Sequence, residues 1–571
     1  MLSYRKLAMR VLGRPLHTGG GNDSPRPASQ RAAALVLTAA MLTTLTAPAF
    51  AETWDIEKGD ITVKAGKTEG TNMVSQGEQK DVEDTGTVIT GKSDKNTVTI
   101  EAKDKGDKVE VTLKDLNIDA SRGSEAAVSV TGKGDTNIEL DGDNELKGAH
   151  NRAGLEHNQT VDGEGNVTSG KLTIQDENND GSLNATGKGF AAGIGGGSVK
   201  AGQVTITGGT ITATGEDGAG IGGGHGNMGS NAGNADIEIS GGTIEATGGY
   251  ASAGIGGGTW GDANIKITGD AVIKNATGGV YGSGIGGGNG ASGTVVIKDD
   301  STVTATGGEA GAGIGGGYAG LGDVTIEGNT TVNATGGVGS AGIGSGVDSV
   351  NDNAGNGNKI TIKSNANGSP TVKAVGGGTH KENQVFIGGA GIGSGAGDAT
   401  AEITLEGKVT ITATAGKDNV AIGANGIEQE FSGLAEGSSI TRYDSEGNNI
   451  TLPTDPVPAV PSASGGGSAD ASVQESVFPG LVVTDKDGQR ISYTSIRGNN
   501  VLSLRVGRFT ASLRASLSTL RQLRAEGIDT ITFQTILCST TLSVDELLAM
   551  GGEDAEAVLT HRLTASSLTV G

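Results

Sequence analysis

Apolar and polar residues in the central part of this chain alternate in a pattern that returns at a nearly constant interval. Each return holds three short segments: an apolar-x-apolar run such as Val204-Thr-Ile206, a threonine-rich run such as Thr210–Thr214, and the phrase Ala-Gly-Ile-Gly-Gly-Gly. The isoleucine of that phrase, including two variants, recurs at positions 194, 221, 255, 285, 314, 343, 392 and 422, which gives gaps of 27, 34, 30, 29, 29, 49 and 30 residues. Strict alternation over a few residues predicts a half-buried strand. Three strands per repeat predict the coils of a parallel β-helix.

The threonine-rich run indicates which side chains face the interior. Because successive residues of a strand point to opposite faces, the columns that begin at Ile211 and Ala213 should be internal, and those that begin at Thr210 and Thr214 external. Residues 61–190 carry similar runs at looser spacing, and Ala153-Gly-Leu-Glu156 resembles a variant of the repeated phrase. We therefore expect an all-β fold of about ten or eleven coils, right-handed as parallel crossovers nearly always are.

Changes in composition divide the chain into four parts. Residues 1–51 hold a basic segment, an apolar stretch (Ala32–Leu45) and the small-x-small triplet Ala49-Phe-Ala51, which together predict a signal peptide. That stretch is too short to span a bilayer, so no membrane insertion is expected. The β-helix should occupy residues 52–440, and a Pro/Gly/Ser-rich linker residues 441–474.

Residues 475–571 differ in composition and predict a small α+β domain that completes the fold. Helical patterns cover Leu513–Ala525 and, after a capping Ser543, Val544–Met550. Between them Thr530–Leu537 reads as a strand, and Asp485–Gly488 has the composition of a hairpin turn. Nothing in this segment indicates a function.

Charge and cysteine content narrow the possible partners. The chain has 42 basic and 65 acidic residues, and without the six basic and one acidic residue of the leader the net charge is 36 − 64 = −28. This balance argues against nucleic acid, which requires basic surfaces. Cys538 is the single cysteine, so an internal disulfide is impossible even in an oxidising compartment.

Several stretches carry a resemblance to a known family. These are Val109–Ile118, Asn137–Leu146, Asn151–Glu156, Lys171–Ile174 and the repeated Ala-Gly-Ile-Gly-Gly-Gly phrase. They resemble secreted bacterial β-helix proteins named carbohydrate-binding domain-containing proteins, common in gut Firmicutes, over roughly residues 60–430. The resemblance implies an extracellular protein that binds polysaccharide, because a related clostridial member binds acidic plant polysaccharide and carries calcium. It transfers no ligand residue to this chain.

Enzymes that degrade pectin are similar in architecture, but their catalytic residues are not matched. Pectate lyases need an arginine base, and residues 52–474 contain only Arg122, Arg152 and Arg442, none within the regular repeats. Polygalacturonases need aspartate pairs before a Gly-His-Gly, whereas here Asp299-Asp300 follows Gly224-His-Gly226. We therefore expect a protein without catalytic activity.

Aromatic residues are scarce and unusually placed. His225, Trp260 and Tyr318 lie within two residues after Gly-Gly-Gly, whereas Phe190, Tyr250 and Tyr281 shortly precede Ile-Gly-Gly-Gly. Stacked coils would align them in two rows near the edges of one face, where exposed rings can stack on sugars. Alternatively, the rings close the corners between coils.

Two acidic segments suggest calcium ligands. Asp176, Asn178 and Asp180 crowd oxygen atoms into one segment, and Asp141 and Asp143 do so in another. Calcium needs six to eight oxygen ligands, which such loops can supply. Solvated turns rich in Asp, Asn and Gly have the same composition and remain the alternative.

These observations predict a secreted, non-catalytic protein that binds an acidic polysaccharide or other glycan, with calcium as a possible cofactor. The alternative is a surface adhesin or stalk that displays its C-terminal domain to a protein partner. The chain has no Leu-Pro-x-Thr-Gly sorting signal, so any retention at the cell surface should be non-covalent.

Overall fold

The chain folds into two compact units, Met1–Val460 and Pro461–Gly571. The computed structural model describes residues 52–228, 233–352, 354–379, 388–452 and 455–456 of the first unit. In the second unit it describes residues 481–485, 488–491, 493–498, 500–506, 510–535, 538–551, 555–562 and 565–570. The predicted signal peptide lies outside the described residues.

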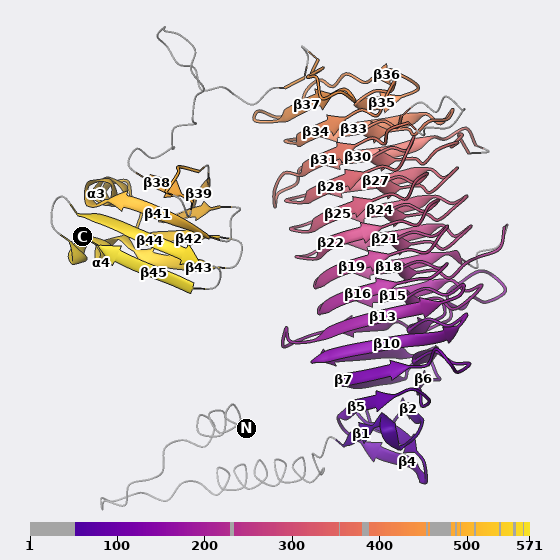
Figure 1. Cartoon of the computed structure of the whole chain (residues 1–571). Coiled ribbons are helices and arrows are strands. Elements are labelled where there is room, and N and C mark those ends of the chain that lie inside the picture. Colours follow the sequence, from indigo (N-terminus) through magenta and orange to yellow (C-terminus); the bar gives the residue numbers. More distant parts are fainter. Residues whose placement is uncertain are drawn as a thin grey trace, which may run out of the picture. The chain divides into compact units, whose positions relative to one another are not determined.

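The first unit is a parallel β-helix in which each regular coil contributes three strands (Figure 1). Strands of the same kind pair in parallel with those of the next coil, so that Val204 is in register with Ile237, Ile211 with Ile244, and Ile221 with Ile255. The first stack comprises β1 (Thr53–Asp55), β5 (Thr87–Ser93), β7 (Lys108–Asp119), β9 (Asp135–Asp141), β12 (Leu172–Gln175), β15 (Gly202–Ile206), β18 (Ala235–Ile239), β21 (Ala263–Ile267), β24 (Gly293–Ile297), β27 (Gly322–Glu327), β30 (Asn358–Lys363) and β33 (Ala401–Glu406).

The other two stacks complete the coils. The second stack starts in the last residues of β5 and β7 and continues through β10 (Asp143–His150), β13 (Ser182–Lys188), β16 (Thr210–Thr214), β19 (Thr243–Thr247), β22 (Val272–Thr277), β25 (Thr302–Thr306), β28 (Thr331–Thr335), β31 (Thr371–Val375), β34 (Thr410–Thr414) and β37 (Ser439–Tyr443). The third stack holds β2 (Ile61–Ala65), β6 (Val98–Ala102), β8 (Val128–Gly132), β11 (Leu155–His157), β14 (Ile194–Gly195), β17 (Ile221–Gly222), β20 (Ile255–Gly256), β23 (Ile285–Gly286), β26 (Ile314–Gly315), β29 (Ile343–Gly344), β32 (Ile392–Gly393) and β35 (Ile422–Ala424).

The number of parallel strands in the third stack gives the number of coils. Its 15-stranded sheet contains three antiparallel members, β3, β4 and β36, so 15 − 3 = 12 strands stack in parallel within the described part of the chain. The prediction of ten or eleven coils was therefore slightly low. The extra coils lie near the N-terminus, where loop lengths vary and the repeated phrase is replaced by variants such as Leu155, which pairs with Ile194.

The core is a narrow apolar interior that runs along the solenoid. Ile211, Ile244 and the isoleucines of the repeated phrase are fully buried, whereas Thr210 is exposed and Thr214 is half-buried. The predicted facing of the threonine-rich runs is thus confirmed. Each fully buried isoleucine contributes about 1.5–3 kcal/mol through apolar burial.

Separate structures close the two ends of the solenoid. At the start, the 3₁₀ turn η1 (Ile56–Lys58) and the antiparallel strands β3 (Asn72–Gln76) and β4 (Gln79–Asp84) cover the first coils. At the far end β36 (Ile427–Glu428) pairs antiparallel with β35. Next to it the fully buried Arg442 donates to Asp455 Oδ2 at 2.6 Å and to Glu428 Oε2 at 2.5 Å.

This end of the solenoid differs from the predicted boundary at residue 440. Arg442 belongs to β37, and the Ile440 N–H donates to the Pro456 carbonyl at 2.9 Å. Residues 441–452 and 455–456 therefore pack with the solenoid instead of forming a linker. A buried guanidinium needs its carboxylate partners nearby, which keeps this segment in place.

The described residues of the second unit form two four-stranded sheets and two helices. One sheet is β38 (Leu481–Thr484), β41 (Thr510–Ser516), β44 (Glu556–Arg562) and β45 (Ala565–Val570), and the other is β39 (Thr494–Gly498), β40 (Val501–Arg505), β42 (Thr530–Gln534) and β43 (Ser539–Ser543). The helices are α3 (Leu517–Ala525) and α4 (Val544–Met550).

Sequence-based expectations for this unit were partly wrong. The capping Ser543 is confirmed, since its Oγ accepts the Glu546 N–H. The helix predicted from Leu513 begins only at Leu517, because residues 513–516 belong to β41 and pair with β38 and β44. None of the helices in the described residues is long and apolar enough to cross a membrane.

Candidate binding surfaces of the solenoid

The turns on either side of the short third strands bring the aromatic residues to one edge of the solenoid. Backbone hydrogen bonds connect these turns from coil to coil: the Tyr281 N–H donates to the Tyr250 carbonyl at 3.2 Å, and the Tyr318 N–H to the Tyr281 carbonyl at 2.9 Å. The His225 N–H likewise donates to the Phe190 carbonyl at 2.7 Å. The two rows expected from the sequence therefore merge into one edge.

Three tyrosines on this edge form a continuous ladder across successive coils. The ring centroids of Tyr250 and Tyr281 are 5.4 Å apart at 82°, and those of Tyr281 and Tyr318 are 5.6 Å apart at 72°. These are edge-to-face contacts, a favourable arrangement for aromatic pairs. The Tyr318 hydroxyl donates to Asp348 Oδ2 at 2.7 Å, and this hydrogen bond raises the pKa of the phenol above its usual range. We call Tyr250, Tyr281 and Tyr318 the tyrosine ladder.

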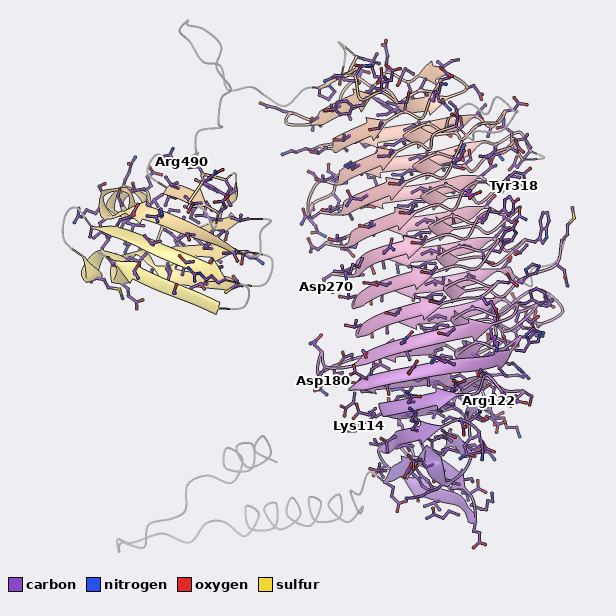
Figure 2. The ribbon with its side chains drawn as sticks, viewed as in Figure 1. Lys114, Arg122, Asp180, Asp270, Tyr318 and Arg490 are labelled. Atoms are coloured by element: carbon purple, nitrogen blue, oxygen red, sulfur yellow. The ribbon has the colours of Figure 1, made fainter. Side chains whose placement is uncertain are left out.

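The aromatic edge leaves much apolar surface in contact with solvent. Tyr250 is 58 % exposed and Phe190 is 42 % exposed. Exposed Val199, Met228 and Val350 belong to loops that follow the short third strands. Tyr318 lies on this edge among protruding side chains (Figure 2). Exposed apolar side chains gathered along one edge are a feature that binding sites commonly share.

Trp260 and His225 lie outside the tyrosine ladder and pack against neighbouring coils. Trp260 adopts a positive φ of 59°, and its ring lies so close to Gly290 that a methyl group there would be 2.1 Å from Trp260 Cζ3. His225 Nδ1 lies 3.1 Å from the hydroxyl of the buried Thr259. Both residues are half-buried and pack against the corner of the next coil. Tyr281 and Tyr318 are half-buried as well, so sugar binding at Trp260, Tyr318, His225, Tyr250 and Tyr281 stays a prediction.

The two acidic segments lie in consecutive turns between the first and second stacks. The Ser182 N–H donates to the Gly142 carbonyl at 2.8 Å, and the Ser182 hydroxyl donates to Asp143 Oδ1 at 2.8 Å. Lys114 and Asp180 are seen on this edge in Figure 2. The fold thus brings together segments that the sequence presented separately.

The carboxylates of Asp141, Asp143 and Asp176 already have partners within the chain. Asp176 accepts the backbone N–H groups of Asp180 and Gly181 at 3.3 and 3.0 Å. Lys114 Nζ lies 2.6 Å from Asp141 Oδ2. Across the described residues, no three His, Cys, Asp or Glu side chains are grouped so that they could hold a metal ion. Calcium binding at Asp141, Asp143, Asp176, Asn178 and Asp180 stays a prediction, as does the alternative of solvated turns.

The residues that resemble a polygalacturonase motif lie on different turns. His225 follows β17 on the aromatic edge, whereas Asp299 and Asp300 lie between β24 and β25. There Asp299 Oδ2 accepts the Gly269 N–H and Asp300 Oδ1 accepts the Asn329 side-chain amide. The fold does not bring the histidine and the aspartates into one site.

One concave surface was missed by the sequence analysis. A groove of about 650 Å³ lies over the outer face of the first stack near the N-terminal end. It is lined by Glu69, Gly70, Asn72, Thr85, Gly86, Thr87, Val88, Lys108, Glu110, Val111, Thr112, Asn137, Glu139, Gln175, Glu177 and Asn178. We call it the N-terminal groove. Its residues come from five strands and three loops, so no local sequence pattern could have indicated it.

Comparison with known proteins agrees with the architecture. Residues 179–198, 204–225, 237–259, 295–318 and 324–347 match the family described as beta helix repeat. These matches and the stacked strands define the class: this is a β-helix protein built of tandem repeats. No curated protein and no solved structure shows a significant match to the chain.

Proposed function

We propose that this β-helix is an exported, non-catalytic protein that binds polysaccharide along its aromatic edge. The observation that carries the proposal is the tyrosine ladder. Its Tyr250 ring is 58 % exposed and contributes little to the core, so packing does not account for it. Aromatic rings lose few degrees of freedom on binding and offer a flat apolar face beside a polar hydroxyl. Sugar rings present the complementary surface, with C–H groups on one face and hydroxyl groups around the edge.

The repetition of the edge favours a polymer over a single small molecule. Parallel coils stack about 4.8 Å apart, so a chain that lies along the solenoid meets similar contacts at each coil. The proposal includes calcium-assisted binding of an acidic polysaccharide, because a protein with a net charge of 36 − 64 = −28 without its leader repels such a ligand unless cations lie between them. The predicted signal peptide supports export.

The test compares Tyr250→Ala with Trp260→Ala in binding to polygalacturonate, each with and without a calcium chelator. Loss of the Tyr250 ring should weaken binding by about 1 kcal/mol, or roughly fivefold, through lost apolar contact. Its melting temperature should stay unchanged because the ring is largely exposed. Trp260→Ala should instead lower the melting temperature and leave the affinity of the folded protein unchanged. Unaltered binding by Tyr250→Ala would refute a role for the ladder.

The alternative is a stalk that displays the second unit to a protein partner. It is favoured by the separate core of that unit, which includes the fully buried Leu481, Leu504, Leu520 and Phe533. Removal of residues 461–571 distinguishes the two functions. Polysaccharide binding by the remaining chain supports the first, and its complete loss supports the second.

A further inference from the structure

The N-terminal groove is a built feature of the fold and lies away from the tyrosine ladder. Its floor is formed by outward side chains of adjacent strands in register: Thr112 of β7 pairs with Glu139 of β9, which pairs with Gln175 of β12. A second row places Glu110 next to Asn137. The rim comes from the loop between β2 and β3, the loop before β5 and the loop after β12. The volume of about 650 Å³ is typical of ligand sites.

Hydrogen bonds hold the wall of the groove in place. The amide of Asn72, on β3, donates to the Thr87 hydroxyl at 2.9 Å and to the Glu110 carbonyl at 2.7 Å. Asn72 is only 5 % exposed, so these bonds fasten the end-covering strands to β5 and β7. On the other side, the Glu177 N–H donates to Glu139 Oε1 at 2.8 Å and fixes the loop after β12. A preformed site of this kind binds without a large ordering cost.

The groove carries a strong excess of negative charge. Four lining residues are glutamates and one is a lysine, which gives 1 − 4 = −3. Lys108 Nζ lies 2.5 Å from Glu110 Oε1, so these two charges offset each other. Glu69, Glu139 and Glu177 remain. Among the described residues, Glu139 Oε2 has no hydrogen-bond partner although it is shielded from solvent. Added positive charge is therefore favourable here.

The neutral residues that line the groove further restrict the class of ligand that fits it. Asn137, Gln175, Asn178 and Thr112 each offer both hydrogen-bond donors and acceptors, which match hydroxyl groups. An extended peptide could not pair its backbone with the floor, because β7, β9 and β12 are hydrogen-bonded to neighbours on both sides. A ligand rich in both hydroxyl groups and positive charge satisfies all of these constraints.

We propose that the N-terminal groove binds a short stretch of an oligosaccharide that carries free amino groups. The ammonium groups would lie near Glu139 and Glu177, and the hydroxyl groups would bond to the amides of the floor. This inference goes beyond the proposed function, since it concerns a second site with its own residues and the opposite preference for ligand charge.

The test is calorimetric titration of the full chain with a glucosamine tetramer at about pH 6, where the amino groups of the ligand carry a positive charge. Glu139→Gln and Glu177→Gln should each weaken binding about tenfold, because each removes a negative charge that attracts the ammonium groups of the ligand. Glutamine at 139 retains an oxygen that can accept the Glu177 N–H, so the variant should fold normally. Glu402→Gln is the matched control, since Glu402 is exposed on β33 outside the groove.

Three comparisons decide the outcome. The N-acetylated tetramer, which lacks the positive charge, should bind at least tenfold more weakly, and equal binding would overturn the proposal. Spermine or trilysine binding as tightly as the glucosamine tetramer would overturn the saccharide assignment. An equal loss in Glu402→Gln would overturn the location. Tyr250→Ala should leave this binding unchanged, which separates failure here from failure of the ladder.

Discussion

Gly315, which follows the isoleucine of the repeated phrase in β26, should tolerate no side chain. Its φ is +128°, and a Cβ there would lie 2.1 Å from the carbonyl oxygen of Gly344 in the next coil. The same position in the other regular coils is always glycine, with φ between +124° and +152°: Gly195, Gly222, Gly256, Gly286, Gly344, Gly393 and Gly423. The close approach of successive coils at this column requires the absence of a side chain.

Gly315→Ala should destabilise the fold in two ways, through backbone strain and through steric overlap, and other glycines allow the two effects to be measured separately. A non-glycine residue at such a φ costs about 1–3 kcal/mol, and forcing a methyl group into packed backbone costs about 1–3 kcal/mol more. The sum is roughly 2–6 kcal/mol. Gly355 has a φ of +84° with open space around its Cβ position, so Gly355→Ala should show only the first cost. Gly378 has neither feature, and Gly378→Ala should be neutral or slightly stabilising.

Thermal unfolding and amide hydrogen exchange measure this series. Because stacked repeats can open locally, the loss in Gly315→Ala should be greatest in exchange protection of the coils that contain Ile314 and Ile343. The expected order of stability is Gly378→Ala, then Gly355→Ala, then Gly315→Ala. If Gly315→Ala is as stable as Gly378→Ala, the coils do not approach each other as closely as the structure has them.

Two further predictions concern the interior. Ile314→Asp should lower the free energy of unfolding by several kcal/mol, because it places a carboxylate in an apolar column. Thr304→Asp on the outer face should change that free energy by less than about 0.5 kcal/mol. Equal melting temperatures of the two variants would contradict the assigned facing of the side chains. His157 is 2 % exposed, and burial lowers its pKa below the ordinary value near 6.5. The His157 side chain therefore binds a proton more tightly in the unfolded chain than in the folded one, so the free energy of unfolding should fall as the pH drops below about 6.5. Urea unfolding at several pH values should show a larger fall in the parent protein than in His157→Gln.

The sequence predicts which residue types could bind a ligand, but not how these residues are arranged in space. The sequence places Tyr250, Tyr281 and Tyr318 near the repeated phrase, but not in one ladder. Their contact depends on how each turn meets the turn of the next coil, which is fixed by backbone hydrogen bonds between coils. Trp260 lies one residue further from its Gly-Gly-Gly than Tyr318 does, at the positive-φ position that Ala319 occupies in the turn of Tyr318, and there its ring packs on Gly290.

What the sequence by itself determined is the coil. Every repeat has the same alternation of apolar and polar residues. The burial of Ile211, the outward position of Thr210 and the strand at Ile314 therefore follow from alternation and periodicity alone. Local capping likewise sufficed for the helix after Ser543.

Only the tertiary structure decided which distant residues meet. Residues 513–516 have a helical pattern but join β41, because pairing with strands on both sides outweighs local propensity. The N-terminal groove gathers Glu69, Glu110, Glu139 and Glu177 from different coils. Their proximity arises from the stacking register and the lengths of the intervening loops, which act between coils and leave no periodic trace within any one of them.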